Sequence, residues 1–346
     1  MKVILPIADD PLLNQLPSYA HPLSILLLDR ERNLPYLLND FVLPAAKKEN
    51  GVLCNAAYDW MYIGCGALSY ECGVFPQSIL EEPPALLDFL LAMLRRGRYC
   101  LMDLDEFHCR FSGRYQREHA AGGFLINGMD TEQGRIYLCG YSQNGLYTQN
   151  AVSLEEFAQA LGGSSADLAV HCLREKPGSP APVFNTAAFF RQAGAYADPD
   201  GVKGLPEGYV YGFSAISAFI DQIVEAKRRR GALSWHSVST LREHKALMAA
   251  RLSYLAERGV LEPEFPARYR EIRRLTDDLY ALALAYRDEA RQPVNEFYSL
   301  AVNYQGAQER FLLEKMEAKA VRLRNAERDF FAELGRAGIR EEIKNG

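Results

Sequence analysis

Histidines and aspartates gather in one stretch of the first half of the sequence. A short apolar run ends in Asp103 and Asp105, and His108 and His119 follow it in a segment with no clear periodicity. Asp130 comes after the next apolar run. An imidazole beside a carboxylate can perform general acid–base catalysis or ligate a metal ion. The same residue types are also common in loops and turns without any function, so a purely structural interpretation stays open at this point.

The apolar runs around these residues predict the elements that position them. Residues 99–104, 124–127 and 135–139 are typical of strands, and the turn-forming residues 130–134 predict a hairpin between the last two. A helix is predicted over residues 85–94, because prolines precede the run and a glycine follows it. The histidines would then lie in a long loop between two strands of a sheet.

The second half of the sequence has a different texture. From about residue 215 onward, stretches rich in Ala, Leu and charged residues carry apolar side chains at helical spacing. A capping box at Thr240–Glu243 opens one of these helices. Short connections between amphipathic helices favour an antiparallel bundle.

The change in texture predicts an α+β protein of two parts. We expect a domain over residues 1–175 with helices packed on a small antiparallel sheet, and an all-helical bundle over residues 211–346. Between them, residues 176–210 are rich in proline and glycine and predict a linker or connecting segment.

Composition excludes several classes of protein. Of the 346 residues, 48% are hydrophobic and 24% are charged, which is typical of a globular chain. The net charge of −5 argues against a nucleic-acid partner, and no apolar run is long enough to predict a membrane span. The seven cysteines fit neither a disulfide framework nor a zinc knuckle. We therefore expect reduced thiols in the cytoplasm and neither a metal ion nor another cofactor.

An ordered set of short motifs runs through the same region. The motif residues are Tyr99 to Phe107, Tyr115, His119, Leu125, Ile126, Gly128, Asp130, Val152 and Ser153. Further matching segments are residues 20–26, 39–43, 210–213 and 243–252. Together they resemble the N-terminal domain of butirosin biosynthesis protein H and its relatives, a family of bacterial peptide and polyketide gene clusters. The resemblance covers most of the chain, and the order of the motifs is more specific than any one of them.

This resemblance implies a papain-like fold and transfer of an acyl group from a carrier protein to an amine through a cysteine thioester. Such a mechanism uses a thiolate at a helix start, a histidine base and a third group that orients the imidazole. This chain departs from the family at both reacting positions. Gly122 stands where the family has its histidine, and Gly123 follows where an acidic residue is common. The first cysteine is Cys54, well past the first helix, and the nearest hydroxyl at that helix is Ser18.

A replacement catalytic set can be drawn from the remaining residues. It would use Ser18 as nucleophile, His119 as base and Asp130 as the group that orients the base. The double glycine would leave an open floor in the cleft that admits part of a ligand. The residues expected to bind the ligand are Asp105, His108, Tyr115, Gly122, Gly123 and His21.

Two functions remain open from the sequence. The first is acyl or peptidyl transfer in bacterial antibiotic and other specialised-metabolite biosynthesis, acting on a small molecule or peptide or on a substrate bound to a carrier protein. The second is a catalytically inactive accessory or scaffold protein of such a pathway, a pseudoenzyme that binds a partner enzyme or a carrier protein. The missing cysteine–histidine pair leaves it open whether the chain is an enzyme, and a homodimer is also left open.

Overall fold

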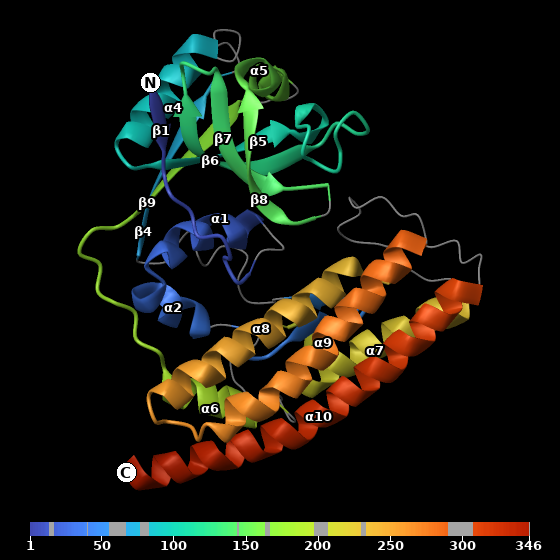
Figure 1. The fold of residues 1–346 in the computed structure, drawn as a ribbon. Helices are drawn as coiled ribbons and strands as arrows, with labels where there is room; N and C mark the ends of the chain where they lie inside the picture. Colours follow the sequence, from blue (N-terminus) through green and yellow to red (C-terminus); the bar gives the residue numbers. More distant parts are fainter. Residues whose placement is uncertain are drawn as a thin grey trace. The chain divides into compact units, whose positions relative to one another are not determined.

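The chain forms two units in the computed structural model, each described here by itself (Figure 1). One unit comprises Met1–Asn33 and Trp60–Ala181, and we call it the sheet unit. The other comprises Leu34–Asp59 and Pro182–Gly346, and we call it the helical unit. The structure describes residues 1–13, 17–39, 41–54, 67–76, 83–143, 145–162, 167–196, 207–229, 233–289 and 307–345.

An antiparallel sheet is the centre of the sheet unit. Its strands run in the order β4-β9-β5-β6-β7-β8, and β1 pairs with β6 beside this path. The strands are β1 (Lys2–Ile4), β4 (Leu68–Phe75), β5 (Tyr99–Asp105), β6 (Ala121–Asp130), β7 (Arg135–Tyr141), β8 (Tyr147–Ser153) and β9 (Leu168–Glu175). The predicted hairpin is confirmed, because Asp130 pairs with Arg135 where β6 turns into β7.

One face of this sheet packs on helices α4 (Pro83–Arg95) and α5 (Leu154–Gly162) (Figure 1). Leu86, Leu90 and Leu94 recur every four residues, so they form one apolar stripe on α4. They pack in one buried cluster with Cys100, Met102 and Leu104 of β5 and with Phe157, Ala160 and Leu161 of α5. Burying each leucine stabilises the fold by about 1.5–3 kcal/mol. This cluster is the core of the sheet unit.

The opposite face of the sheet packs on α1 (Pro17–Leu26), which lies on the other side in Figure 1. Side chains alternate between the faces of a strand, so Asp103 and Asp105 point away from the core cluster. Antiparallel pairing places Gly123 opposite Asp103 and Ala121 opposite Asp105. The candidate residues at the end of β5 therefore lie on the α1 face of the sheet or at its edge.

The helical unit combines long helices with a small second sheet. Its strands are β2 (Ala45–Lys47), β3 (Leu53–Cys54) and β10 (Tyr209–Tyr211), in the order β10-β2-β3. Its helices are α6 (Thr186–Gly194), α7 (Gly212–Arg229), α8 (Trp235–Glu257), α9 (Glu264–Glu289) and α10 (Ala307–Asn345). In the sheet unit, η1 (Leu27–Asp29) leads into α2 (Arg30–Leu38), whose last residues belong to the helical unit. Helices are thus confirmed in the second half, but the predicted capping box at Thr240–Glu243 lies inside α8, which begins at Trp235 with Ser234 as its cap.

A glycine is required where β10 meets α7. Gly212 has φ +55°, and its N–H donates to the Pro44 carbonyl at 2.9 Å. A Cβ atom at this position would lie 2.3 Å from the backbone oxygen of Tyr196, which cannot move aside as a side chain can. Only glycine satisfies both the left-handed backbone and this close approach.

The interior of the helical bundle contains a fully buried polar network. Lys245 of α8 and Glu327 of α10 are both 0% exposed, and Lys245 Nζ lies 2.5 Å from Glu327 Oε1. The Tyr196 hydroxyl donates to Glu327 Oε2 at 3.1 Å, and Lys245 Nζ lies 3.0 Å from His244 Nδ1. Burial lowers the pKa of Lys245 and raises that of Glu327, and the opposite charge of each partner counteracts the shift. The two charged groups therefore depend on each other.

The division into units corrects the predicted domain boundaries. The predicted first domain includes residues 34–59, but β2 pairs with β10 and β3 pairs with β2, so this segment belongs to the helical unit. The predicted linker over 176–210 contains α6, which packs on α10, while residues 197–206 lie outside the described part of the chain. None of the helices that the structure describes combines the length and apolar character that a membrane crossing requires.

Candidate functional site

A histidine–aspartate pair lies where β5 ends and β6 begins. The His119 Nδ1 atom is 2.6 Å from Asp105 Oδ2. The other carboxylate oxygen, Oδ1, accepts backbone N–H groups from Phe107 at 3.0 Å and from Ala120 at 3.2 Å. The Asp105 side chain is 5% exposed, whereas that of His119 is 66% exposed. A buried, fixed carboxylate thus holds an imidazole that faces solvent.

This arrangement sets the chemistry of both groups. Burial acts to raise the pKa of Asp105, but the hydrogen bonds from His119, Phe107 and Ala120 outweigh it and lower the pKa below its usual value. A charged Asp105 accepts a hydrogen bond from the Nδ1–H group of His119, so the neutral imidazole carries its lone pair on Nε2. His119 can therefore accept a proton at Nε2 while Asp105 stabilises the resulting imidazolium.

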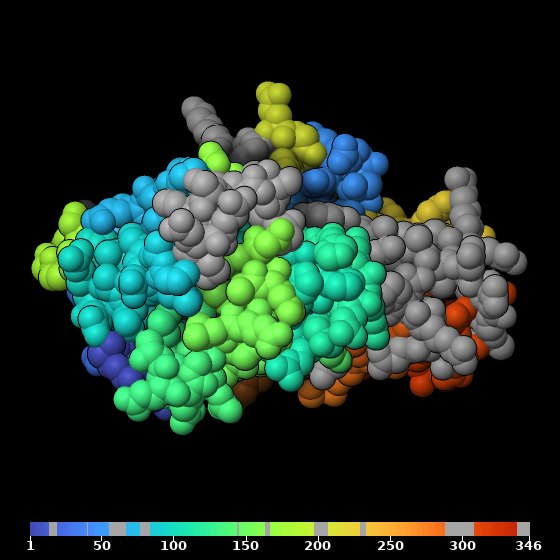
Figure 2. Space-filling view, turned by 90° about the horizontal axis from the view of Figure 1, so that it is seen from above, coloured from blue at the N-terminus to red at the C-terminus, as the bar shows by residue number. Residues whose placement is uncertain are grey.

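The loop that carries this pair is anchored to the sheet unit on both sides. The short helix η2 (Glu106–His108) follows β5 directly, with Asp105 as its cap. Arg110 donates to both carboxylate oxygens of Glu156 on α5, at 3.1 and 3.0 Å. The Phe107 ring stacks on the His119 ring with centroids 4.0 Å apart. The blue-green segment between β5 and β6 forms part of the outer surface in Figure 2.

Gly122 does not form an open cleft floor, contrary to the sequence prediction. It pairs with Leu104, so a side chain here would point to the α4–α5 face rather than to His119. The side chain of Glu106 already occupies that space, held by a hydrogen bond from the Ser112 hydroxyl. Glycine at this position makes room for Glu106.

Restoring a histidine at this position is therefore expected to destabilise the fold. The Cβ atom in Gly122→His would lie 2.6 Å from Oε1 and 2.7 Å from Cγ of Glu106. We expect the free energy of unfolding to fall by about 1–3 kcal/mol in urea denaturation, because Glu106 must leave its site. Gly162→His is the matched control, since open space surrounds Gly162. If Gly122→His lowered the free energy of unfolding equally in a Glu106→Ala background, this explanation would be contradicted.

His21 is a buried packing residue rather than a ligand contact. It is 0% exposed, with Nδ1 at 2.8 Å from the Tyr147 hydroxyl and Nε2 at 3.0 Å from the Gly123 carbonyl oxygen. Burial lowers its pKa to about 4, against the effect of the hydrogen bond that the ring donates to the Gly123 carbonyl, so the ring is neutral at pH 7. Gly123, predicted to bind a ligand, instead fixes α1 to β6 through its carbonyl.

Asp130 does not orient His119. It lies at the far end of β6, and nine residues of strand place it about 30 Å from the start of that strand. Its carboxylate accepts the backbone N–H groups of Glu132 and Gln133 at 3.1 and 3.0 Å, so it caps the hairpin turn. Ser18 lies in the first turn of α1, and its side chain lies outside the described residues. The predicted set of Ser18, His119 and Asp130 is therefore not brought together.

The remaining predicted residues lie in the loop itself. His108 Nε2 is 4.0 Å from Asp105 Oδ2, and the His108 ring contacts Phe107 edge-on with centroids 5.1 Å apart. Tyr115 accepts a hydrogen bond from its neighbour Gln116 at 3.1 Å. The sequence did not identify Asp105 as the orienting carboxylate. Its position as the last residue of a strand could have indicated this role. The antiparallel partner strand begins at Ala121, so the residues just before Ala121, including His119, come to lie beside Asp105.

The described cysteines offer no activated thiol at this pair. Cys109 and Cys139 are buried, and burial raises the pKa of each to about 12. Cys72 is exposed but lies on β4, which pairs with β9 rather than with β5 or β6. Cys100 of β5 and its partner Cys172 of β9 lie in the buried core cluster with α4 and α5, on the other face of the sheet from Asp105. Among the described residues near β5 and β6, no cysteine is therefore placed to act as a nucleophile for His119.

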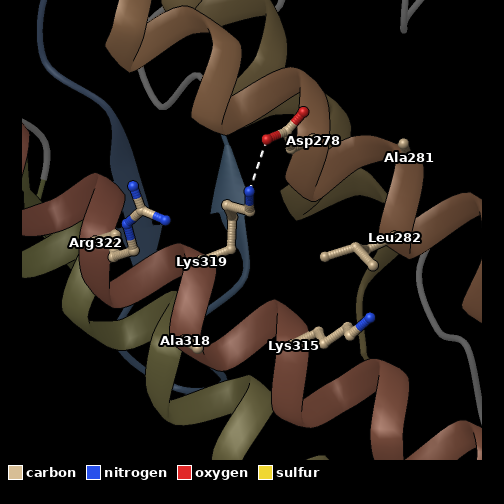
Figure 3. A pocket seen from close by; sticks show the side chains of 7 residues that line it. All are labelled: Asp278, Ala281, Leu282, Lys315, Ala318, Lys319 and Arg322. Carbon is tan, nitrogen blue, oxygen red and sulfur yellow. Dashed lines mark hydrogen bonds and ion pairs between the residues drawn. The ribbon is translucent and has the colours of Figure 1, made fainter.

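A second concave site lies in the helical unit, between α9 and α10 (Figure 3). This open groove has a volume of about 570 Å³. Its lining residues are Asp278, Ala281, Leu282, Lys315, Ala318, Lys319 and Arg322. Lys319 Nζ lies 2.6 Å from Asp278 Oδ2. The lining also contains Lys315 and Arg322, so it carries more positive than negative charge. The groove suits an anionic group, but its described lining holds no histidine or nucleophile.

No family model matches the chain, and no curated protein sequence matches it. The geometry of the site and the motifs of the chain therefore carry the functional argument.

Proposed function

We propose that the sheet unit catalyses acyl or peptidyl transfer, with His119 as general base and Asp105 as the residue that orients it. The observation that carries this proposal is the 2.6 Å contact between His119 Nδ1 and Asp105 Oδ2, made by a buried carboxylate to an exposed imidazole. This is the base-and-orienting-group arrangement that acyl transfer uses. The motif resemblance to butirosin biosynthesis protein H suggests the same class of reaction and a papain-like fold for this unit.

The transfer would proceed by direct attack of the acceptor on the acyl group. His119 Nε2 takes a proton from the acceptor amine or hydroxyl as its nitrogen or oxygen bonds to the acyl carbon. The bond from that carbon to the leaving thiol or alcohol then breaks. The leaving group takes the proton back from the imidazolium, so His119 and Asp105 return to their starting state. No nucleophile of the protein is needed, in agreement with the absence of an activated described cysteine at the pair.

The setting of this reaction rests on the resemblance alone. It suggests bacterial specialised-metabolite biosynthesis, a cytoplasmic location, and an acyl donor bound to a carrier protein or presented by a peptide. The free thiols at the six described positions fit a reducing compartment. Ser18 remains a predicted nucleophile for a two-step variant of the reaction.

A second candidate function is a catalytically inactive accessory protein that binds a partner enzyme or carrier protein. The observation that favours it is the filled space above Gly122, where Glu106 occupies the position of the family's histidine side chain. In this case the scaffold would persist without chemistry, and the exposure of His119 would have no catalytic meaning.

Acyl transfer assays separate the two functions. The purified full chain is incubated with short acyl thioesters of N-acetylcysteamine and a panel of primary amines, and the thiol released is measured. We expect turnover that His119→Ala abolishes and that His171→Ala retains, since His171 lies on β9 and bonds to Tyr70. Equal rates for wild type and His119→Ala would refute the proposed reaction, and binding of a carrier protein without turnover would support the accessory function.

A further inference from the structure

Three potential metal ligands converge at the end of β5. One atom from each of Asp105, His108 and His119 lies within 4.8 Å of the others. We propose that these three residues bind one divalent cation of the zinc class, and that this cation reversibly inhibits the His119–Asp105 pair. The metal site stands on the geometry of the side chains, and only its inhibitory effect rests on the proposed function.

One of the two distances from Asp105 Oδ2 to a histidine nitrogen is shorter, and the other longer, than the spacing of ligand atoms around a tetrahedral ion. Zinc–nitrogen and zinc–oxygen bonds of about 2.0–2.1 Å place neighbouring ligand atoms about 3.3 Å apart. Asp105 Oδ2 lies 2.6 Å from His119 Nδ1 and 4.0 Å from His108 Nε2. An ion at this point requires one distance to widen and the other to shorten by roughly 0.7 Å each. Rotations of the two imidazoles supply such changes without moving the strand.

The surrounding contacts already orient the ligands. Backbone N–H groups of Phe107 and Ala120 occupy Oδ1 of Asp105, so Oδ2 is the oxygen presented to both histidines. The Phe107 ring stacks on His119 and makes a T-shaped contact with His108, so it packs against both imidazoles. Such supporting contacts around the ligands are typical of metal sites in proteins.

The donor set defines the class of ion. Two imidazole nitrogens and one carboxylate oxygen suit Zn²⁺, Co²⁺, Ni²⁺ or Cu²⁺ better than Mg²⁺ or Ca²⁺, which prefer oxygen ligands. The side chains of His108 and His119 are 26% and 66% exposed, so solvent can supply a fourth ligand. The sequence predicted no metal because the spacing of the cysteines fits no zinc knuckle, and this site contains no cysteine.

The cation and the proton compete for the same atoms. A bound ion would replace the proton between His119 Nδ1 and Asp105 Oδ2, and Asp105 would then neutralise the ion instead of an imidazolium. The metal-loaded form therefore loses the assistance that the carboxylate gives to the base. In cells this would make the transfer reaction sensitive to free zinc.

Titration with Co²⁺ tests the metal site independently of any activity. The thiols of the full chain are alkylated first, and the d–d absorbance of Co²⁺ is followed. We expect one Co²⁺ per chain, displaced by Zn²⁺, with no thiolate charge-transfer band. His108→Ala should weaken binding by more than about 100-fold, since the loss of residues that only support metal ligands already costs about 10–100-fold. His171→Ala is the matched control, because its ring bonds to Tyr70 away from the cluster.

Two results would overturn the site. One is no saturable absorbance with the wild-type chain, and the other is equal affinity in wild type and His108→Ala. His108→Asn, which retains a polar side chain, is measured beside His108→Ala, and thermal unfolding verifies that both variants are folded. Saturable cobalt binding without inhibition of acyl transfer would keep the site and refute only its inhibitory effect.

Discussion

Replacing Lys245 by methionine is expected to lower the free energy of unfolding by about 3–5 kcal/mol. Methionine fills much of the space of the lysine, so packing is largely kept. The loss comes from Glu327, which is 0% exposed and would remain buried without the ammonium group 2.5 Å away. Urea denaturation followed by the helical circular dichroism signal measures the change.

The loss in free energy of unfolding caused by Lys245→Met should depend on pH. Burial already holds the folded pKa of Glu327 above its ordinary value, and without the lysine only the hydrogen bond from Tyr196 opposes burial, so the folded pKa rises further. A group with a raised folded pKa stabilises the fold below its unfolded pKa, and this contribution is lost as pH rises through the folded pKa. The deficit relative to wild type should therefore be smaller at pH 5 than at pH 8. The Glu327 carboxylate contacts Tyr196 and Lys245, and Lys245 in turn contacts His244.

Two further variants isolate the effect of the buried pair. Lys245→Met combined with Glu327→Met should recover much of the lost stability, because two apolar side chains leave no uncompensated charge. Arg268→Met is the matched surface control, since Arg268 and Glu333 form an exposed pair at 2.6 Å in the same unit. We expect it to cost less than about 1 kcal/mol. A double variant as unstable as Lys245→Met would contradict the explanation by unpaired charge.

Asp105→Asn is expected to lower kcat/KM for acyl transfer by about 10²–10⁴-fold. Asparagine keeps the size of the side chain and can still accept the backbone N–H groups of Phe107 and Ala120. It cannot stabilise an imidazolium at His119, and its amide can donate to Nδ1 and so favour the wrong tautomer. Steady-state rates with the best thioester and amine pair measure the effect.

Asp130→Asn is the matched comparison, because the sequence and the structure predict different results for it. If Asp130 oriented the base, its loss would match that of Asp105→Asn. The structure places it at the hairpin, where asparagine can still cap the turn, so we expect less than about a twofold change. Equal losses in the two variants would show that the pair at the end of β5 is not the catalytic one.

Local patterns in the sequence predicted much of the fold. The prolines and glycine around residues 85–94 marked α4, and the turn residues 130–134 marked the hairpin between β6 and β7. The apolar stripes of the second half marked α8, α9 and α10. Each of these signals acts within a few residues, so no knowledge of distant contacts was needed.

The site required information that local patterns lack. Asp105 and Asp130 both stand at strand ends, and only the pairing of β5 with β6 decides which one lies beside His119. Likewise, the sequence around Gly122 predicted an open cleft floor. The structure shows that Gly122 pairs with Leu104 and that the Glu106 side chain fills the space above it. The assignment of residues 34–59 also depended on a partner, because β2 pairs with β10, far away in the sequence.

The passage of residues 34–59 through the helical unit has a consequence for biosynthesis and inheritance. During translation, β2 and β3 leave the ribosome long before β10, so the small sheet cannot close until the whole sheet unit has been made. If the chain were cut after residue 181, the N-terminal piece would carry β2 and β3 without β10. The C-terminal piece would carry β10 without β2, the strand that pairs with it. Neither unit can thus be exchanged as one continuous piece by simple end-to-end gene fusion.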